Sequence, residues 1–355
     1  MRISAALLRW YDWARRDLPW RRETSPYRTL VSELMAQQTT LAVVVPYFQR
    51  FMARFPSLQA LADASDEEVM AHWSGLGYYA RARNLRRAAV AAVAEHGGAL
   101  PDTEEALRRL PGVGPYTAAA VASIAFGART FALDGNGLRV LSRLFAVEEA
   151  IDRPATRARL RELGTAEVPA ARPGDFNQSV MELGALVCTP RHPRCDECPV
   201  ARACAAHTRG MTATLPRRSP KPARPVVRVA CALVTDGARL LLVKRGGGLL
   251  RGTWTLPERE ADPAQAPAAA RALAADAGLR AQAVDRRGVV RQIFTHRDVR
   301  AEVFRIEVGR ARRAPGADLR WVSPAALGEL GLSNYARKTI AVGLGQKPDN
   351  PAFRP

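Results

Sequence analysis

The chain has 355 residues, which is enough for two domains that each bury a core. Its 53 Lys and Arg residues against 34 Asp and Glu give a net charge of +19, which favours a polyanionic partner such as nucleic acid, although biased codon usage would give the same arginine excess. The sequence has no apolar run of the roughly 18 residues that a membrane span needs, and charges interrupt its N-terminus, so we expect neither membrane insertion nor secretion but a cytoplasmic, nucleoid-associated protein.

The first 208 residues carry apolar side chains at helical spacing and show no strand-like alternation. Short breakers such as Phe55-Pro56 and Gly97-Gly98 separate the helical segments. We therefore predict an all-α domain over residues 1–208. Its clearest helices are expected at Leu41–Phe55, Glu67–Trp73, Ala80–Glu95, Tyr116–Phe126 and Leu138–Phe145.

Residues 209–225 contain four prolines and few large apolar side chains, which is typical of a semi-rigid linker. After the linker the periodicity changes, and Asp236-Gly237 predicts a hairpin turn. We predict an α+β domain over residues 226–345. Its expected strands are 226–235, 239–244, 288–294 and 299–308, and its expected helices are 264–277 and 334–344.

Glu33 lies in a predicted helix among apolar neighbours, with Gln37 expected on the same helical face. A glutamate in a helix is usually solvated. Here the apolar neighbours favour a buried carboxyl, and burial raises the pKa of a carboxyl and prepares it as a proton donor.

Residues 110–116 join two predicted helices. Gly112 and Gly114 permit positive φ angles, and Pro115 suits the first turn of the second helix. The free N–H groups of that helix would form an anion site. Further along, Asp134 precedes the next helix, where an aspartate commonly serves as an N-cap.

Four cysteines lie close together at the end of the helical domain: Cys188, Cys195, Cys198 and Cys204. Thiolates ligate zinc or iron–sulfur clusters, and this irregular spacing favours iron–sulfur, with zinc as the alternative. The pattern resembles that of the endonuclease III family of helix-hairpin-helix DNA glycosylases. The resemblance implies a [4Fe–4S] cluster that holds the basic loop 190–194 against DNA phosphates.

The strings 18–21, 32–39 and 75–84 resemble those of the MutY branch, the adenine DNA glycosylases. The resemblance implies that Glu33 protonates adenine at N7 and that Asp134 stabilises the positive charge that develops at C1′. Tyr116 would donate a hydrogen bond to Asp134 or to the sugar. The other implied site residues are Asn136 near the catalytic groups; Trp20, Arg21 and Gln178 in the base pocket; Gln38 and Tyr78 as wedges; and Gly112, Gly114, Arg81 and Arg83 as DNA contacts. Ala36 departs from the leucine that is common in relatives, which puts the packing near the wedge in doubt.

Bifunctional relatives use a lysine in the hairpin helix to form a Schiff base and cut the DNA backbone. The matching residue here is Tyr116, and residues 1–220 contain no lysine. The resemblance therefore implies a monofunctional glycosylase.

Residues 248–257 and 271–279 resemble a Nudix fold, but the metal-binding glutamates of that family fall here on Ala272, Ala275 and Asp276. One remaining acid does not form the usual Mg²⁺ site, so we do not expect a nucleotide diphosphatase. The domain instead resembles the one with which adenine glycosylases recognise 8-oxoguanine. The Phe-Ser-His loop of that domain matches Phe294, Thr295 and His296.

The sequence therefore predicts a monomeric N-glycosylase that flips adenine out of double-stranded DNA, opposite 8-oxoguanine or guanine, and excises it. A thymine or uracil mismatch glycosylase is one alternative, but such enzymes lack a Nudix-like domain. A non-catalytic DNA-damage-binding protein is the other. The presence of both Glu33 and Asp134 argues against it.

Overall fold

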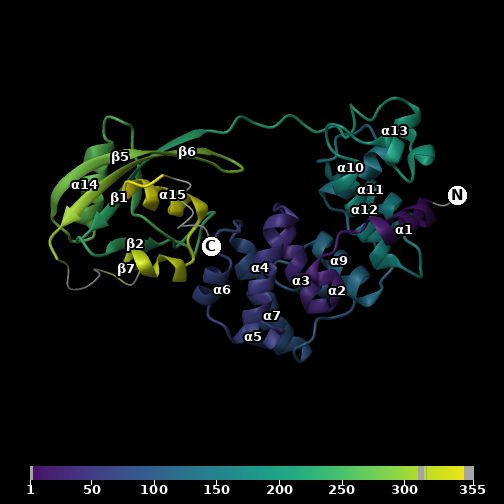
Figure 1. The fold of residues 1–355 in the computed structure, drawn as a ribbon, viewed down its shortest axis with the longest axis horizontal. Coiled ribbons are helices and arrows are strands. Elements are labelled where there is room, and N and C mark those ends of the chain that lie inside the picture. The colour runs from purple at the N-terminus through teal and green to yellow at the C-terminus, as the bar shows by residue number, and fades with distance from the viewer. Residues whose placement is uncertain (1–2, 311–315, 317, 348–355) are drawn as a thin grey trace. The chain divides into compact units, whose positions relative to one another are not determined.

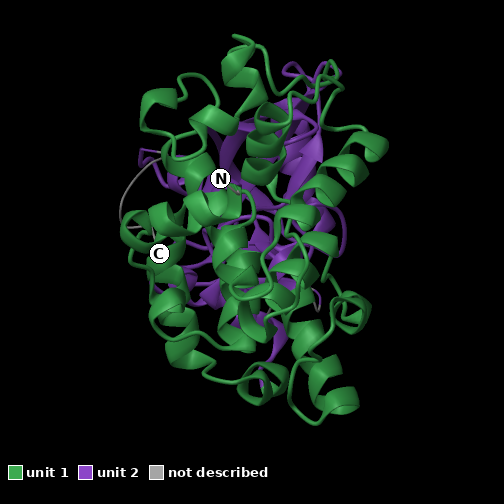
Figure 2. Ribbon diagram, turned by 90° about the vertical axis from the view of Figure 1, so that its right-hand side faces the viewer, with its two compact units in different colours: residues 1–63, 84–221 green, residues 64–83, 222–355 purple. Residues whose placement is uncertain are grey.

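The computed structural model describes residues 3–310, 316 and 318–347. Its contacts divide the chain into two compact units, coloured separately in Figure 2. Unit 1 comprises residues 1–63 and 84–221, and unit 2 comprises residues 64–83 and 222–355. The segment 64–83, which the sequence pattern places in the helical domain, thus makes its main contacts within unit 2.

Unit 1 is helical, as predicted, and the part of it that the structure describes contains no strand (Figure 1). Helix α7 (Ala80–His96) begins in unit 2 and continues into unit 1. The other helices of unit 1 are α1 (Ile3–Ala14), α2 (Pro19–Arg22), α3 (Pro26–Ala36), α4 (Leu41–Arg54), α5 (Leu58–Asp63), α8 (Glu104–Arg109), α9 (Pro115–Phe126), α10 (Gly135–Leu144), α11 (Pro154–Glu167), α12 (Pro173–Leu186), η1 (Cys195–Glu197), η2 (Ala201–Ala203) and α13 (Ala205–Thr208).

Local sequence signals set where the helices that carry the site begin. Ser25 caps α3 by accepting a hydrogen bond from the backbone N–H of Arg28, and Pro26 occupies the first turn. Helix α9 likewise begins with Pro115, directly after Gly114. Helices α1, α10 and α12 share a core that includes Trp10, Leu138 and Phe176. This core fixes the spacing between α10, whose N-cap is Asp134, and α12, which carries Gln178.

The first part of the proline-rich linker is bound to unit 1. The carbonyl of Leu215 accepts a hydrogen bond from Arg143 Nε at 2.8 Å, and that of Arg217 accepts one from the Ile151 N–H at 3.0 Å. These bonds anchor the chain up to residue 217 beside α10 and the loop that follows it.

Unit 2 is built on a seven-stranded sheet with the order β3-β2-β1-β6-β5, to which β4 adds beside β1 and β7 beside β2. The central strands β1 and β6 are parallel, and the other strand pairs are antiparallel. The strands are β1 (Val226–Thr235), β2 (Leu240–Lys244), β3 (Trp254–Thr255), β4 (Glu258–Glu260), β5 (Ala281–Ile293), β6 (Asp298–Val308) and β7 (Leu319–Val322).

Helices cover both faces of the sheet (Figure 1). Helix α14 (Ala266–Asp276) packs buried alanines such as Ala270 against Ala232 and its neighbours on β1. Helix α15 (Asn334–Gly343) lies on the other face, where Gly343 fits closely against Leu233. A short η3 (Pro324–Glu329) precedes α15. Because adjacent β1 residues point to opposite faces, the strand is buried on both sides.

The segment 64–83, with α6 (Asp66–His72), is attached to unit 2 by buried polar contacts. Ser74 Oγ donates to the carbonyl of Leu332 at 2.9 Å and accepts from the Leu332 N–H at 3.0 Å. Tyr79 Oη donates to the same carbonyl at 2.8 Å, and Arg337 Nη2 donates to Ser74 Oγ at 2.9 Å. These bonds hold residues 74–79 beside the start of α15.

Candidate active site

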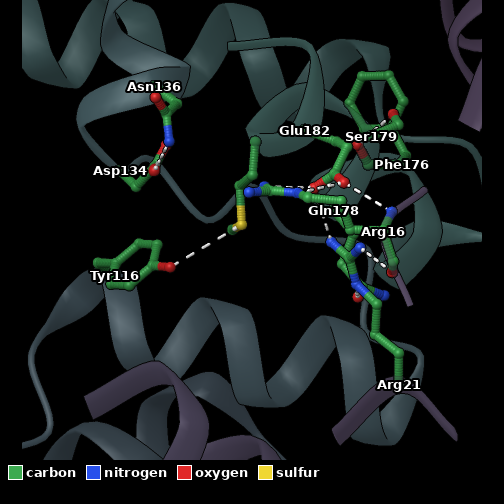
Figure 3. A network of polar contacts seen from close by, with 10 residues as sticks. Arg16, Arg21, Tyr116, Asp134, Asn136, Phe176, Gln178, Ser179 and Glu182 are labelled. Atoms are coloured by element: carbon green, nitrogen blue, oxygen red, sulfur yellow. Dashed lines mark hydrogen bonds and ion pairs between the residues drawn. The ribbon is translucent and has the colours of Figure 1, made fainter. Parts of the chain in front are cut away.

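Glu33 and Tyr116 form the first half of the candidate catalytic centre. Glu33 lies on α3 and Tyr116 in the first turn of α9, and the tyrosine hydroxyl donates a hydrogen bond to Glu33 Oε2. The hydroxyl also lies 3.9 Å from the sulfur of Met181 (Figure 3). Tyr116 was expected to donate to Asp134 or to the sugar, but among the described residues its hydroxyl donates to Glu33.

Burial raises the pKa of Glu33 to about 7. The hydrogen bond from Tyr116 opposes this rise, whereas the negative charge of Asp134 adds to it. A carboxyl with this pKa is about half protonated at neutral pH, which suits a group that must donate a proton to a substrate.

Asp134 is the N-cap of α10 and also lies close enough to Glu33 to influence its charge. Its Oδ1 accepts the Gly137 N–H at 2.6 Å, and its Oδ2 accepts from Asn136 Nδ2 at 3.0 Å. Arg139 Nη2 in turn donates to Asn136 Oδ1 at 2.7 Å, which fixes the orientation of the amide. Burial raises the pKa of Asp134, while the hydrogen bonds from Gly137 and Asn136 act in the opposite direction.

The three residues predicted for the base pocket lie on two elements. Arg21 Nε donates to Gln178 Oε1 at 3.0 Å, which joins α2 to α12 (Figure 3). The ring of Trp20 meets that of Phe48 edge to face, with 5.1 Å between the centroids. Arg21 and Gln178 are therefore in direct contact, and Trp20 is held separately against α4.

The sequence analysis missed two residues of this network, Arg16 and Glu182. The Glu182 carboxylate accepts hydrogen bonds from Arg16 and from Arg21 Nη2, although 166 residues separate Arg16 from Glu182. The one signal in the sequence was that Glu182 follows Gln178 by four residues, a spacing that places both side chains on the same face of a helix.

The hairpin between α8 and α9 uses its two glycines differently. Gly112 has φ +75°, and a Cβ there would lie 2.3 Å from the Cβ of Asn84, so only glycine fits. Gly114 has φ −83°, so the positive φ that a glycine permits is not used at this position. Gly114 is instead the N-cap of α9 and offers no side chain, which leaves the first N–H groups of α9 without a side-chain cap.

The two predicted wedge residues both have left-handed backbones. Gln38 has φ +60° and Tyr78 has φ +48°, and both side chains are exposed. Helix α3 ends at Ala36, so Gln37 does not continue the helical face of Glu33; its Nε2 donates instead to Thr117 Oγ1 at 3.0 Å. Left-handed backbone is unfavourable for residues other than glycine and often marks functional loops.

Arg81 differs from its predicted role as a DNA contact. It is 7% exposed, and its Nη2 donates to the carbonyl of Gly77 at 3.0 Å while the guanidinium lies over Trp73. Arg81 therefore holds the loop that carries Tyr78 and does not face solvent. Arg83 is half-buried, and its Nη1 donates to the carbonyl of Arg251 within unit 2.

Unit 2 contains a cavity of about 180 Å³, here called the Tyr78–Phe294 pocket, because these two residues lie in its wall. Phe294 and Thr295 belong to the tip of the β5–β6 hairpin, which closes with a bond from the Phe294 N–H to the carbonyl of Arg297 at 2.8 Å. The ring of Phe294 meets that of Tyr335 edge to face at 6.0 Å. His296 lies at the same tip but is exposed and does not line the pocket. The remaining lining residues are Gly77, Tyr79, Leu249, Leu250, Gln292, Ile293, Ser333, Asn334 and Tyr335.

The four cysteines line one small cavity beside α10 and the loop 188–204. All four are of intermediate exposure, and none of them forms a disulfide. Arg143 Nη1 lies 3.3 Å from Cys188 Sγ and donates to the carbonyl of Thr189 at 2.7 Å. Their number and residue type match the four thiolate ligands that a [4Fe–4S] cluster takes, although among the described residues no three His, Cys, Asp or Glu side chains are close enough together to hold a single metal ion.

Two family models match the chain. Residues 31–165 match the HhH-GPD superfamily of base excision DNA repair proteins, and residues 229–342 match the NUDIX domain. These matches confirm the predicted fold class, a helix-hairpin-helix glycosylase domain followed by a Nudix-like domain.

Individual relatives give a consistent picture. A thermostable thymine-DNA glycosylase of known structure superposes with a TM-score of 0.54 at 29% identity, over 58% of this chain and 95% of that one. The rat adenine DNA glycosylase is 40% identical over 72% of this chain, which spans 60% of the rat protein. The human adenine DNA glycosylase is 37% identical over 98% of this chain and 74% of its own length. Because this match includes nearly the whole chain and most of the relative, the chain belongs to the adenine DNA glycosylase family.

Proposed function

We propose that the chain removes adenine from double-stranded DNA by hydrolysing the N-glycosidic bond, as a step of base excision repair. The observation that carries the proposal is the pairing of Glu33 with Tyr116 beside Asp134, with the pKa of Glu33 raised to about 7. Hydrolysis of a glycosidic bond needs one neutral acid and one carboxylate near the reacting carbon. These two groups supply that combination.

In the proposed reaction the neutral form of Glu33 gives its proton to N7 of the flipped adenine, which makes the base a better leaving group. Asp134, fixed by Asn136 and by the N-terminus of α10, stabilises the positive charge at C1′ as the bond breaks. Trp20, Arg21 and Gln178 hold the base. Ionised Glu33 then accepts a proton from the attacking water.

The reaction is proposed to stop at base removal. A backbone-cutting step through a Schiff base needs an amine, and the hairpin position holds Tyr116, whose hydroxyl is committed to Glu33. The described contacts of Tyr116 thus support the monofunctional assignment that the lysine-free segment 1–220 suggests.

We further propose that the adenine lies opposite 8-oxoguanine or guanine and that unit 2 recognises this partner base. Phe294 and Thr295 at the hairpin tip lie in the wall of the same pocket as Tyr78, and His296 is exposed beside them. Gln38 and Tyr78, both exposed on left-handed backbones, are proposed to enter the base stack. The uncapped first turn of α9 after Gly112 and Gly114 would bind a DNA phosphate.

Cys188, Cys195, Cys198 and Cys204 are proposed to hold a [4Fe–4S] cluster. The bound cluster would supply a rigid cross-link of the loop 188–204, and the catalytic step does not pass through it. Arg143 would help to orient the loop through its bonds to the carbonyls of Thr189 and Pro190.

One experiment tests the proposed function and its main competitor. Duplexes that contain A:8-oxoguanine, A:G, T:G or U:G pairs are incubated with the protein, and strand breaks are scored with and without alkali. We expect breaks at adenine only after alkali treatment. Release of thymine or uracil would instead favour the activity named for the thymine-DNA glycosylase relative, and breaks without alkali would refute the monofunctional assignment.

A further inference from the structure

Glu182 is a buried carboxylate beside the base pocket that makes no contact with Glu33 or Asp134 among the described hydrogen bonds. Its side chain is 1% exposed and accepts the Arg16 N–H at 2.8 Å, Arg16 Nε at 2.8 Å, Arg16 Nη2 at 2.9 Å and Arg21 Nη2 at 3.1 Å (Figure 3). Although burial acts to raise it, hydrogen bonds from Arg16 and Arg21 lower the pKa of Glu182 to about 2. Glu182 is therefore ionised at neutral pH.

Arg21 uses each nitrogen of its guanidinium for a different partner. Nη2 donates to Glu182, Nη1 donates to the carbonyl of Arg16 at 3.0 Å, and Nε donates to Gln178 Oε1 at 3.0 Å. The side chain is only 12% exposed. Its bonds to the Glu182 carboxylate and to the Arg16 carbonyl hold the planar guanidinium, which leaves Nε aimed at Gln178.

This arrangement fixes which end of the Gln178 amide faces Arg21. Arginine nitrogens only donate, so the amide atom next to Nε must be the oxygen. The amide nitrogen of Gln178 then points away from Arg21, and it has no hydrogen-bond partner among the residues that the structure describes. Its two N–H groups are left for an acceptor on the bound base.

We propose that Glu182 is a positioning residue for base selection, because by holding Arg21 it keeps the Gln178 amide turned with its donors toward the base. This inference rests on the proposed adenine excision. N1 of adenine is an acceptor and matches an amide N–H, whereas N1 of hypoxanthine and guanine carries a hydrogen and would oppose it. Turning the amide to suit these bases would set its NH₂ against Arg21 Nε, so the fixed arginine opposes their binding.

The test is the selectivity between adenine and hypoxanthine, each placed opposite 8-oxoguanine and released under single-turnover conditions. In Glu182→Gln the neutral side chain no longer holds two arginines, so Arg21 and Gln178 can reorient. We expect the adenine-to-hypoxanthine rate ratio to fall about tenfold or more. The Gln178 amide can then turn its oxygen toward N1–H of hypoxanthine, so that two donors no longer face each other. Glu182→Asp keeps the charge and should recover part of the ratio. An unchanged ratio in folded Glu182→Gln overturns the inference.

Glu104→Gln is the matched control, because Glu104 also joins an arginine, Arg161, and accepts from Thr130 Oγ1 at 2.6 Å, outside the base pocket. The adenine-to-hypoxanthine rate ratio of Glu104→Gln should equal that of the wild type. If circular dichroism shows that Glu182→Gln does not fold, Arg21→Lys replaces it, since a lysine cannot hold Glu182 and Gln178 in the same fork. An unchanged ratio in that variant also overturns the inference. A wild type that releases no adenine would instead refute the proposed function itself.

Discussion

A carboxyl whose pKa is raised by burial lowers the stability of the folded protein at every pH above the pKa that the carboxyl has in the unfolded chain. The pKa of Glu33 is raised by burial from its ordinary 4.5 to about 7. Below pH 4.5 the carboxyl is neutral in the folded and unfolded chains alike. Between pH 4.5 and 7 the unfolded chain has lost this proton and the folded chain has kept it, so stability falls as pH rises.

The size of the effect follows from the same two pKa values. A rise from 4.5 to about 7 corresponds to a loss of about 3 kcal/mol in the free energy of unfolding, complete once the pH exceeds 7. Glu33→Gln keeps the shape of the side chain but never ionises, so it does not share this loss. We therefore expect the free energy of unfolding of the variant, relative to that of the wild type, to rise by about 3 kcal/mol as the pH increases from 4.5 to 8.

The measurement is the unfolding of both proteins followed by circular dichroism at closely spaced pH values from 4.5 to 8. Comparison with Glu33→Gln cancels the titration of the groups that do not interact with Glu33. Glu95→Gln, at an exposed position of α7, serves as a control and should follow the wild type. A constant difference between wild type and Glu33→Gln across this range would show that Glu33 is not a buried, neutral carboxyl.

Three further predictions concern the reaction, the hairpin and the cysteine loop. The rate of adenine release should fall above about pH 7, because Glu33 then ionises. Tyr116→Phe should move this fall to higher pH, because the hydrogen bond from Tyr116 lowers the pKa of Glu33. A pH–rate profile of each protein checks both expectations. Gly112→Ala should lower the free energy of unfolding by about 1–3 kcal/mol, measured in urea, because it forces a side chain into φ +75° and against Asn84. Cys198→Ser should lower the iron content and visible absorption of the purified protein; zinc in place of iron in the wild type would contradict the proposed cluster.

The sequence allowed the helices, the central strands and the Glu33 environment to be predicted, because each depends on local pattern. Apolar neighbours of Glu33 indicated burial; the side chain is partly buried between them, and desolvation raises its pKa. The strands β3, β4 and β7 were missed, since segments of two to four residues carry too little alternation to be recognised.

What could not be predicted are contacts between residues far apart in the chain. Arg81 has the type and neighbourhood of a DNA contact, but Trp73 and the carbonyl of Gly77 turn it inward. Tyr116 donates to Glu33 because α3 packs against α9, and no local sequence pattern predicts this packing. Position 114 needed no positive φ, because an N-cap has extended backbone that any residue can adopt.

The base pocket shows how carboxylates of one site acquire different charges. Glu33 is kept partly neutral by burial and by the negative charge of Asp134, while the positive charge of Arg21 opposes this and favours its ionised form. Arg21 is paired with ionised Glu182, whose negative charge opposes the effect of Arg21 on Glu33. A free Arg21 would lower the pKa of Glu33 and remove the proton that the proposed reaction needs at neutral pH. The same ion pair that orients Gln178 therefore also protects the acid, and Glu182→Gln should move the alkaline limb of adenine release to lower pH as well as weaken base selection.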